Sequence, residues 1–249
     1  MTGDIMNVFL VGAGPGDEGL ITVKGLDLIK KADIIIYDDL VGKNLLKYSK
    51  EDAELIYVGK RKGKHSHKQE EINNILVEKA KDAIANNKIV VRLKGGDSFI
   101  FGRGGEEVLE LKKHNIDYEM VPGITSSIAV PEVSDIPLTH RKVATSFTVV
   151  TGHEAEDKKE NEKQVKLSEL NANTIVILMG ITNLENHVME LLKNQNRTVD
   201  TPVAIIMNGT RPDQKIIKGN LGNIVNIAKE NNIAPPGIIV VGDVVNVLE

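Results

Sequence analysis

The sequence contains no cysteine and no tryptophan among its 249 residues. The absence of cysteine excludes disulfide bonds, iron–sulfur clusters, thiol nucleophiles and cysteine-ligated zinc sites. It also fits a reducing compartment, and we expect a cytoplasmic protein. Aromatic residues make up only 3% of the chain, so the side chains on which single-stranded nucleic acids stack are scarce.

A basic excess and long apolar runs are missing as well. Lysine and arginine number 31 against 35 acidic residues, which gives a formal charge of −4, whereas proteins that bind nucleic acid generally carry an excess of basic residues. No run approaches the ~20 apolar residues that a bilayer-spanning helix needs. We therefore expect neither a nucleic-acid partner nor a membrane partner.

Short β-branched runs alternate with helical patterns through the first half of the chain. Helices are predicted over 21–32, 69–87 and 106–114, and strands are predicted over 7–12, 33–39, 54–59, 88–96 and 117–123. Continuous apolar strands separated by helices are typical of a parallel sheet covered on both faces. Residues 1–122 are therefore predicted to form an open α/β domain whose sheet is mainly parallel.

The second half, residues 123–249, restarts the pattern after Pro122–Gly123 and is predicted to be a second open α/β domain. Its strands are predicted over 144–152, 174–180, 202–209, 214–220 and 237–245. Only a short turn separates 202–209 from 214–220, which predicts a hairpin and hence a mixed sheet. Open α/β sheets bind ligands at the carboxyl ends of their strands, so we expect the active site in the cleft between the two domains.

The first predicted strand runs into the segment GAGPGD, residues 12–17. A dinucleotide-binding fingerprint needs a third glycine where Asp17 stands, and Pro15 removes a backbone donor. An acidic residue at this point would also repel phosphate. The segment favours an uncharged or cationic ligand, and the alternative is a tight turn that Asp17 caps.

A longer glycine-rich segment, RLKGGDSFIFGRGGEE, covers residues 92–107. Gly95 and Gly96 would let the backbone approach a ligand closely, because glycine has no side chain to obstruct it. Asp97 would present a carboxylate able to accept hydrogen bonds from a ribose or an α-amino group. The alternative is a flexible connector whose charges are solvated.

Basic residues gather in residues 58–71 of this otherwise acidic chain. They are Lys60, Arg61, Lys62, Lys64 and Lys68, with His65 and His67 between them. The segment could attract a polyanionic small molecule, or it could be a solvated loop. The two histidines have no third ligand nearby, so we expect no metal.

Two further segments place polar or soft side chains near strand ends. Thr125 or Ser126 could cap the helix expected next, and Arg141 adds a cation. Met179 follows a predicted strand, where it could lie against an adenine or belong to the core. Gly209 follows the next strand in the same way.

In this order and spacing the motifs resemble the tetrapyrrole methylase superfamily, and within it the branch that methylates uroporphyrinogen III. The segments that carry the resemblance are 12–17, 37–41, 57–66, 90–107, 121–129, 136–141, 179–180 and 202–210. Rival interpretations are a later corrin-ring methylase, diphthine synthase, a methylase of ribosomal RNA ribose, or a non-catalytic sensor of S-adenosylmethionine. A sensor would leave the basic segment unexplained.

The resemblance implies S-adenosylmethionine as the methyl donor, two successive methylations at C2 and C7 to give precorrin-2, no metal, and a homodimer. It implies that Asp38 accepts a proton, that Lys60 donates one, and that Glu106 faces the macrocycle. Arg103 and Arg141 would contact substrate carboxylates. The implied donor-binding residues are Pro15, Gly95, Gly96, Asp97, Ile100, Thr125, Ser126, Met179 and Gly209.

Overall fold

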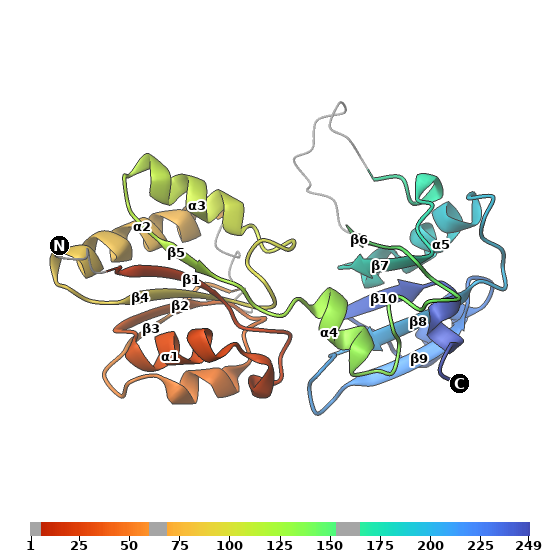
Figure 1. Ribbon diagram of the computed structural model, residues 1–249, viewed down its shortest axis with the longest axis horizontal. Helices are drawn as coiled ribbons and strands as arrows, with labels where there is room; N and C mark the ends of the chain where they lie inside the picture. The colour runs from red at the N-terminus through yellow and green to blue at the C-terminus, as the bar shows by residue number, and fades with distance from the viewer. Residues whose placement is uncertain (1–5, 60–68, 153–164) are drawn as a thin grey trace. The chain divides into compact units, whose positions relative to one another are not determined.

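The chain divides into two compact units, Met1–Thr125 and Ser126–Glu249. The structure is a computed structural model that describes residues 6–59, 69–152 and 165–249. Each unit contains its own five-stranded sheet (Figure 1). Gly123 belongs to the first unit, where it packs against Gly12 and Gly96.

The first sheet is parallel throughout its described pairings and has the strand order β3-β2-β4-β1-β5. Its strands are β1 (Val8–Gly12), β2 (Ile34–Tyr37), β3 (Glu54–Tyr57), β4 (Val90–Lys94) and β5 (Glu119–Val121). The central strands β1 and β4 are buried along their whole length, which suits apolar strands covered on both faces. The prediction of a mainly parallel first sheet is confirmed.

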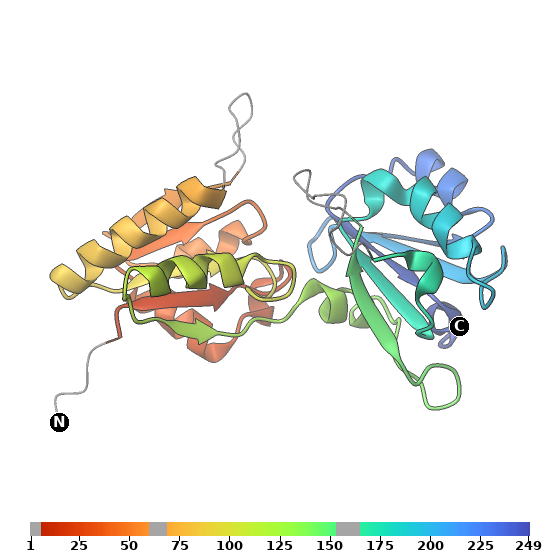
Figure 2. The same ribbon diagram turned by 90° about the horizontal axis from the view of Figure 1, so that it is seen from above.

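Helices cover both faces of this sheet. Figure 2 shows α2 (Gln69–Ala85) and α3 (Gly104–Lys113) lying along one face, where Val77 and Leu111 join its core. The other face carries α1 (Val23–Lys31) with the 3-10 segment η2 (Lys43–Tyr48), and a second 3-10 segment, η1 (Glu18–Leu20), precedes α1. The Thr22 hydroxyl caps α1 by accepting a hydrogen bond from the Gly25 amide at 3.1 Å.

The second sheet is mixed and has the order β6-β7-β10-β8-β9. Its strands are β6 (Phe147–Thr151), β7 (Thr174–Leu178), β8 (Pro202–Met207), β9 (Lys215–Asn220) and β10 (Gly237–Val241). β6 and β7 are parallel, whereas β10 is antiparallel to both of its neighbours. β8 and β9 form the expected hairpin, so the prediction of a mixed second sheet is confirmed.

Helices also cover both faces of the second sheet. On one face α5 (Leu184–Leu192) and α6 (Ile224–Glu230) bury Val188 and Ile224. On the other, α4 (Ser126–Glu132) and the 3-10 segment η5 (Asp243–Asn246) bury Val130 and Val244. Two shorter 3-10 segments are η3 (Leu167–Glu169) and η4 (Ile181–Asn183). Within the described ranges, no helix combines the length and the apolar character that crossing a membrane requires.

Candidate active site

Three glycines meet at the carboxyl edge of the first sheet. Gly12 ends β1, Gly96 follows β4, and Gly123 follows β5. A Cβ on Gly123 would lie 2.3 Å from the Gly96 carbonyl oxygen and 2.6 Å from Gly12 Cα. Real Cβ atoms do not approach backbone this closely, so side chains are excluded here and three strand ends converge backbone to backbone.

The GAGPGD loop is tied to the loop after β4. The Gly14 amide donates to the Gly96 carbonyl at 3.2 Å, and the Gly96 amide donates back at 2.7 Å. Gly14 and Gly96 both have positive φ angles, +76° and +67°, which glycine adopts readily. Asp17 caps η1 through the Gly19 amide at 2.8 Å, as the turn interpretation expects. This pairing places Pro15 beside the Gly95–Asp97 loop.

Asp97 is engaged by backbone amides on both of its carboxylate oxygens. Oδ1 accepts from the Phe99 amide at 2.8 Å, and Oδ2 accepts from the Gly123 amide at 3.1 Å. Asp97 therefore joins the ends of β4 and β5, a structural role that sequence reasoning did not anticipate. Each oxygen keeps a lone pair for a ligand, because a carboxylate accepts about four hydrogen bonds.

Asp38 follows β2 at the same edge of the sheet. Its Oδ1 accepts from the Leu40 amide, and its Oδ2 pairs with Arg92 Nη2, both at 3.1 Å. Leu40 in turn lies against Gly95, where a Cβ would come within 2.5 Å of the leucine Cβ. The structure thus brings Asp38, Gly95, Gly96 and Asp97 together at one edge.

Asp38, which is 26% exposed, is the outermost member of a cluster of alternating charges that is otherwise buried. We call this cluster the charged quartet: Asp38, Arg92, Lys94 and Glu107. Glu107 Oε1 accepts from Arg92 Nε at 3.0 Å and from Lys94 Nζ at 2.9 Å. Glu107 is fully buried, and the side chains of Arg92 and Lys94 are 3% and 6% exposed. Two cations face two carboxylates, so the quartet is neutral when every member is ionised.

Burial lowers the pKa of Lys94 below its ordinary value, and the positive charge of Arg92 lowers it further. Glu107 opposes both effects by accepting a hydrogen bond from the ammonium group. The two cations therefore compete for one carboxylate oxygen in a dry environment, where like charges repel strongly.

Sequence reasoning missed Arg92, Lys94 and Glu107 as a unit. A signal was present, because two cations two residues apart in an otherwise apolar parallel strand must face the same side of the sheet. Charged side chains are almost never fully buried unless they are paired. An acidic partner from a covering helix was therefore to be expected.

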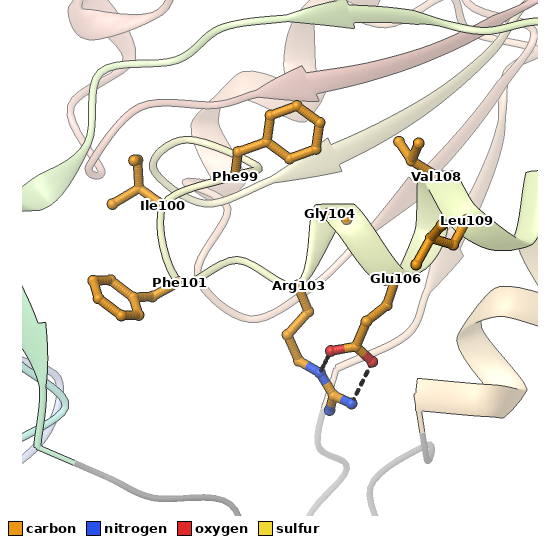
Figure 3. Close-up of a pocket in the computed structure, with 9 residues that line it drawn as sticks. Phe99, Ile100, Phe101, Arg103, Gly104, Glu106, Val108 and Leu109 are labelled. Carbon is orange, nitrogen blue, oxygen red and sulfur yellow. Dashed lines mark hydrogen bonds and ion pairs between the residues drawn. The ribbon is translucent and has the colours of Figure 1, made fainter. Parts of the chain in front are cut away.

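Beyond the edge, the chain forms an open depression of about 720 Å³ lined mostly by apolar side chains. Figure 3 shows Phe99, Ile100 and Phe101 along one loop, with Arg103 and Glu106 beside it. Phe101 and Arg103 both have positive φ angles, 53° and 58°, which are uncommon for residues other than glycine. Ile100, which was predicted to contact the donor, therefore borders the same depression as Arg103 and Glu106, which were predicted to contact the substrate.

Arg103 and Glu106 pair with each other across one turn of helix. Arg103 Nε donates to Glu106 Oε1 at 2.8 Å, and Nη2 donates to Oε2 at 2.7 Å (Figure 3). The hydrogen bond with Arg103 lowers the pKa of Glu106, so that this carboxylate stays ionised at neutral pH. An exposed pair of this kind contributes only about 0.2–1 kcal/mol, so a ligand carboxylate can displace it at low cost.

Two adjacent glycines at the start of α3 should respond oppositely to alanine. A Cβ on Gly104 would lie 2.5 Å from the Ser98 carbonyl oxygen, whereas one on Gly105 would meet nothing within 4 Å. We expect Gly104→Ala to lower the free energy of unfolding by about 1–3 kcal/mol. Gly105→Ala should raise it by up to about 1 kcal/mol through helix propensity. Urea denaturation of both variants checks this, and equal destabilisation would contradict it.

In the second unit, candidate residues leave the sheet at one edge. Leu178 and Met207, the last residues of β7 and β8, pair with Ile238 and Gly237 at the start of β10. Met179 therefore leaves the sheet at the same edge as the turn that contains Gly209, with β10 between their strands. Met179 is half exposed and has a φ of 56°. Its exposure favours a ligand contact over the alternative that it belongs to the core.

The turn around Gly209 is held against α4. A Cβ on Gly209 would lie 2.3 Å from Val130 Cγ1. The Thr210 amide donates to the Gln214 side chain at 2.7 Å, and Asn208 Nδ2 donates to Asp213 Oδ2 at 2.7 Å. These contacts place Gly209 next to the helix that begins at Ser126.

The remaining predicted site residues are less closely grouped. Thr125 is the last residue of the first unit, and Ser126 is the first residue of α4. Arg141 is exposed, in a turn closed by the His140–Ala144 bridge before β6, and within the described ranges no hydrogen bond ties it to Met179 or Gly209. Lys60 and the other lysine, arginine and histidine residues named in the basic segment lie outside the described residues.

His187 of α5 packs against the edge of the second sheet at which β6 and β7 end. Its Nε2 donates to the Gly152 carbonyl at 3.1 Å, and a Cβ on Gly180 would lie 3.3 Å from its Cδ2. Gly152 and Gly180 follow β6 and β7, so the ring packs next to the turn that carries Met179. No group of three or more histidine, aspartate or glutamate side chains suited to a metal ion occurs among the residues that the structure describes.

Burial lowers the pKa of His187 below its ordinary value of 6.5, and the Gly152 carbonyl offsets this in part. The unfolded chain therefore binds this proton at a higher pH than the folded chain does. The stability that His187 contributes is present above about pH 6.5 and is lost as the pH falls below that value. As the pH is lowered from 8 to 5, the melting temperature of His187→Gln should fall less steeply than that of the unsubstituted chain. Identical slopes of melting temperature against pH for the two proteins would contradict this.

The family model for tetrapyrrole (corrin/porphyrin) methylases matches residues 7–225. A uroporphyrinogen-III C-methyltransferase from Methanocaldococcus jannaschii is 72% identical over 249 residues, which covers 100% of this chain and 99% of that protein.

Solved structures show the same fold. A uroporphyrin-III C-methyltransferase from Thermus thermophilus, complexed with S-adenyl homocysteine, matches with a TM-score of 0.80 and 36% identity, over 97% of this chain and 99% of that one. A cobalt precorrin-4 methyltransferase matches with a TM-score of 0.82 and 30% identity, over 97% and 96%. The chain therefore belongs to the tetrapyrrole methylase family.

Proposed function

We propose that the chain transfers methyl groups from S-adenosylmethionine to C2 and C7 of uroporphyrinogen III, giving precorrin-2. The observation that carries this proposal is the 72% identity to a uroporphyrinogen-III C-methyltransferase, because it extends over the full length of both chains. A later corrin-ring methylase is the nearest rival, and the solved example is 30% identical.

The proposed chemistry needs no nucleophile from the protein. An electron-rich pyrrole carbon attacks the sulfonium methyl group, so that a carbon–carbon bond forms while the sulfur–methyl bond breaks and its electron pair returns to sulfur. The ring system then loses a proton and becomes neutral. Alignment of carbon, methyl and sulfur can contribute as much as about 7–11 kcal/mol to lowering the barrier.

The carboxyl edge of the first sheet supports this assignment. Asp38 is a carboxylate fixed at both oxygens and 26% exposed, so it can receive the proton that the ring releases. The Gly95–Asp97 loop and Pro15 offer backbone groups and a carboxylate to the donor. The implied donor-binding set also includes Met179 and Gly209, which lie just after the ends of β7 and β8 in the second unit.

Uroporphyrinogen III carries eight carboxylates, and the proposed cationic contacts are Arg103, Arg141 and the segment that begins at Lys60. Arg103 can exchange its exposed partner Glu106 for a substrate carboxylate. We therefore expect the KM for uroporphyrinogen to rise with ionic strength, because salt screens exposed charges, while the KM for the donor changes less. Steady-state kinetics at about 50 and about 300 mM salt test this, because the Debye length falls from roughly 14 Å to roughly 6 Å between them, and equal sensitivity of the two KM values would count against it.

The assembly and location follow from the same proposal. We expect a homodimer in the cytoplasm that uses neither nucleic acid nor a membrane. Light scattering on the purified protein would report the mass of the assembly, and a monomer would refute the dimer while leaving the reaction untouched.

The experiment that tests the proposed function is anaerobic incubation with uroporphyrinogen III and S-adenosylmethionine, followed by mass spectrometry. We expect the product to be heavier than the substrate by two methylene units. Parallel reactions should contain a later corrin intermediate or the diphthamide precursor. Methylation of one of those acceptors alone would favour a relative's activity, and donor binding with no methylation of any acceptor would favour a sensor.

A further inference from the structure

Arg92 is the member of the charged quartet that contacts Asp38 directly, and the proposed reaction gives it no role of its own. It lies within β4, and its side chain is only 3% exposed. A buried charge is costly unless hydrogen bonds and a counter-charge compensate it, so a guanidinium at this position calls for an explanation beyond packing.

The guanidinium is held on several sides. Nε donates to Glu107 Oε1 at 3.0 Å, and Nη1 donates to the Leu93 carbonyl at 2.9 Å and to the Ile36 carbonyl at 3.4 Å. These anchors come from α3, β4 and β2. Because the guanidinium is a rigid planar fork, fixing Nε and Nη1 also fixes the direction of Nη2.

The remaining corner of that fork meets Asp38. Nη2 lies 3.1 Å from Asp38 Oδ2, while the Leu40 amide holds Oδ1 at 3.1 Å. The orientation of the Asp38 carboxylate is therefore fixed by Arg92 and the Leu40 amide. Its 26% exposure leaves part of the same group open to solvent, whereas Arg92 behind it is closed off.

Glu107 and Lys94 balance the buried charges of this arrangement. Glu107 is fully buried and supplies the counter-charge for Arg92, while Lys94 shares the same carboxylate oxygen at 2.9 Å. Glu107 Oε2 has no hydrogen-bond partner among the described residues. The carboxylate thus concentrates its contacts on the side that faces the two cations.

We propose that Arg92 is a positioning residue for the methyl transfer. Glu107 anchors the Arg92 guanidinium, and the guanidinium orients the Asp38 carboxylate toward the proton that the substrate releases. The proposal rests on the proposed function, in which Asp38 takes that proton. In this step an N–H bond of the methylated pyrrole ring, or a C–H bond of the bridging methylene beside it, breaks. The electron pair of that bond neutralises the positive charge that methylation leaves on the ring, and the proton moves to an Asp38 oxygen and later to water. Arg92 itself neither gains nor loses a proton.

A double-mutant cycle tests whether Arg92 acts through Asp38. Arg92→Lys keeps the positive charge but lacks the fork, so it cannot hold Glu107 and Asp38 in the same geometry. Because a displacement of about 1 Å at a reacting group can cost 10²-fold, we expect kcat to fall about 10–100-fold. The KM for donor and acceptor should stay within about threefold, since neither ligand touches Arg92 in the proposal.

The decisive measurement is the effect of Arg92→Lys on the rate when Asp38 has already been replaced by asparagine. There we expect Arg92→Lys to change the single-turnover rate less than about threefold, because the base through which it acts is already gone. Transfer of a labelled methyl group makes such slow rates measurable. An equal fall in both backgrounds would overturn the proposal, because a merely structural loss does not depend on Asp38.

Arg197→Lys is the matched control. Arg197 is another buried arginine, and it donates to the Leu170 and Ala172 carbonyls at 2.7 and 2.9 Å in the second unit. Its replacement should lower the melting temperature, with the same small effect on the rate in both backgrounds. If Arg92→Lys does not fold, Glu107→Gln enters the cycle instead, and its rate effect must likewise vanish with Asp38→Asn for the proposal to stand.

The cycle separates failure of this inference from failure of the proposed function. If the unsubstituted chain methylates uroporphyrinogen III and Arg92→Lys keeps full kcat, positioning by Arg92 is wrong and the function stands. If the unsubstituted chain transfers no methyl group to uroporphyrinogen III, the proposed function is wrong and the inference falls with it.

Discussion

Replacement of Asp38 by asparagine is expected to lower the rate of methyl transfer by a factor of about 10²–10⁴, the usual contribution of a general base. Asparagine nearly preserves the shape of the side chain but cannot take up a proton at neutral pH. The KM for the donor should change little. Single-turnover methyl transfer to uroporphyrinogen III measures the effect, and unimpaired turnover would remove Asp38 from the role of base.

The same substitution also has a structural cost that must be separated from the chemical one. The two oxygens of Asp38 accept from the Leu40 amide and from Arg92, and asparagine has only one oxygen to offer. One donor is then left facing an NH₂ group, at a cost of about 1–3 kcal/mol. Rates should therefore be compared at a temperature at which the variant is fully folded.

Asp33→Asn supplies the matched control. Asp33 immediately precedes β2, at the opposite end of that strand, and it too accepts from a backbone amide and pairs with a cation. Ile89 donates to it at 2.8 Å and Lys50 at 2.6 Å. We expect Asp33→Asn to destabilise the fold by a similar amount and to leave the rate of methyl transfer within about threefold of the original value, because Asp33 lies away from the carboxyl edge.

Gly123→Ala is expected to lower the free energy of unfolding by about 3 kcal/mol, the upper part of the usual range for overpacking. The added Cβ would come within 2.3 Å of the Gly96 carbonyl oxygen and 2.6 Å of Gly12, and the three atoms nearest to it are all backbone. Relief requires β1, β4 or β5 to shift at its carboxyl end. Donor affinity should fall as well, because the Gly95–Asp97 loop moves with β4.

Denaturant unfolding and calorimetric titration with S-adenosylhomocysteine measure the two effects of Gly123→Ala. Gly19→Ala is the control, because its Cβ would meet only the Asp17 side chain, at 3.3 Å, and a side chain can move aside. We expect it to change stability by less than about 1 kcal/mol. If Gly123→Ala were as stable as Gly19→Ala, the close packing of the three strand ends would be contradicted.

The strands could be predicted because their signal is local. Ile34, Ile35 and Ile36 form an uninterrupted β-branched run, and such a run is buried only where both faces of a sheet are covered. The hairpin of β8 and β9 followed from the number of residues between them. Strand ends were overestimated, however, since β2 stops at Tyr37 and Asp38 lies in the turn that its own side chain closes with Leu40.

The pairing of side chains across elements could not be predicted in the same way. Arg92 and Glu107 are 15 residues apart on a strand and a helix. The local pattern indicates that Arg92 needs an acidic partner, but not which residue supplies it. Arg103 and Glu106 were expected to face a substrate, and the structure adds that they pair with each other. Asp97 was expected to serve a ligand, whereas its two backbone contacts depend on where β5 ends.

The most direct test of the whole account is a crystal structure of the chain with S-adenosylhomocysteine. We predict that the spent donor contacts the Gly95–Asp97 loop of the first unit and the turns at Met179 and Gly209 of the second, with its sulfur facing the side on which Asp38 is exposed. A spent donor bound without touching the Gly95–Asp97 loop, or one held by a single unit alone, would contradict the account.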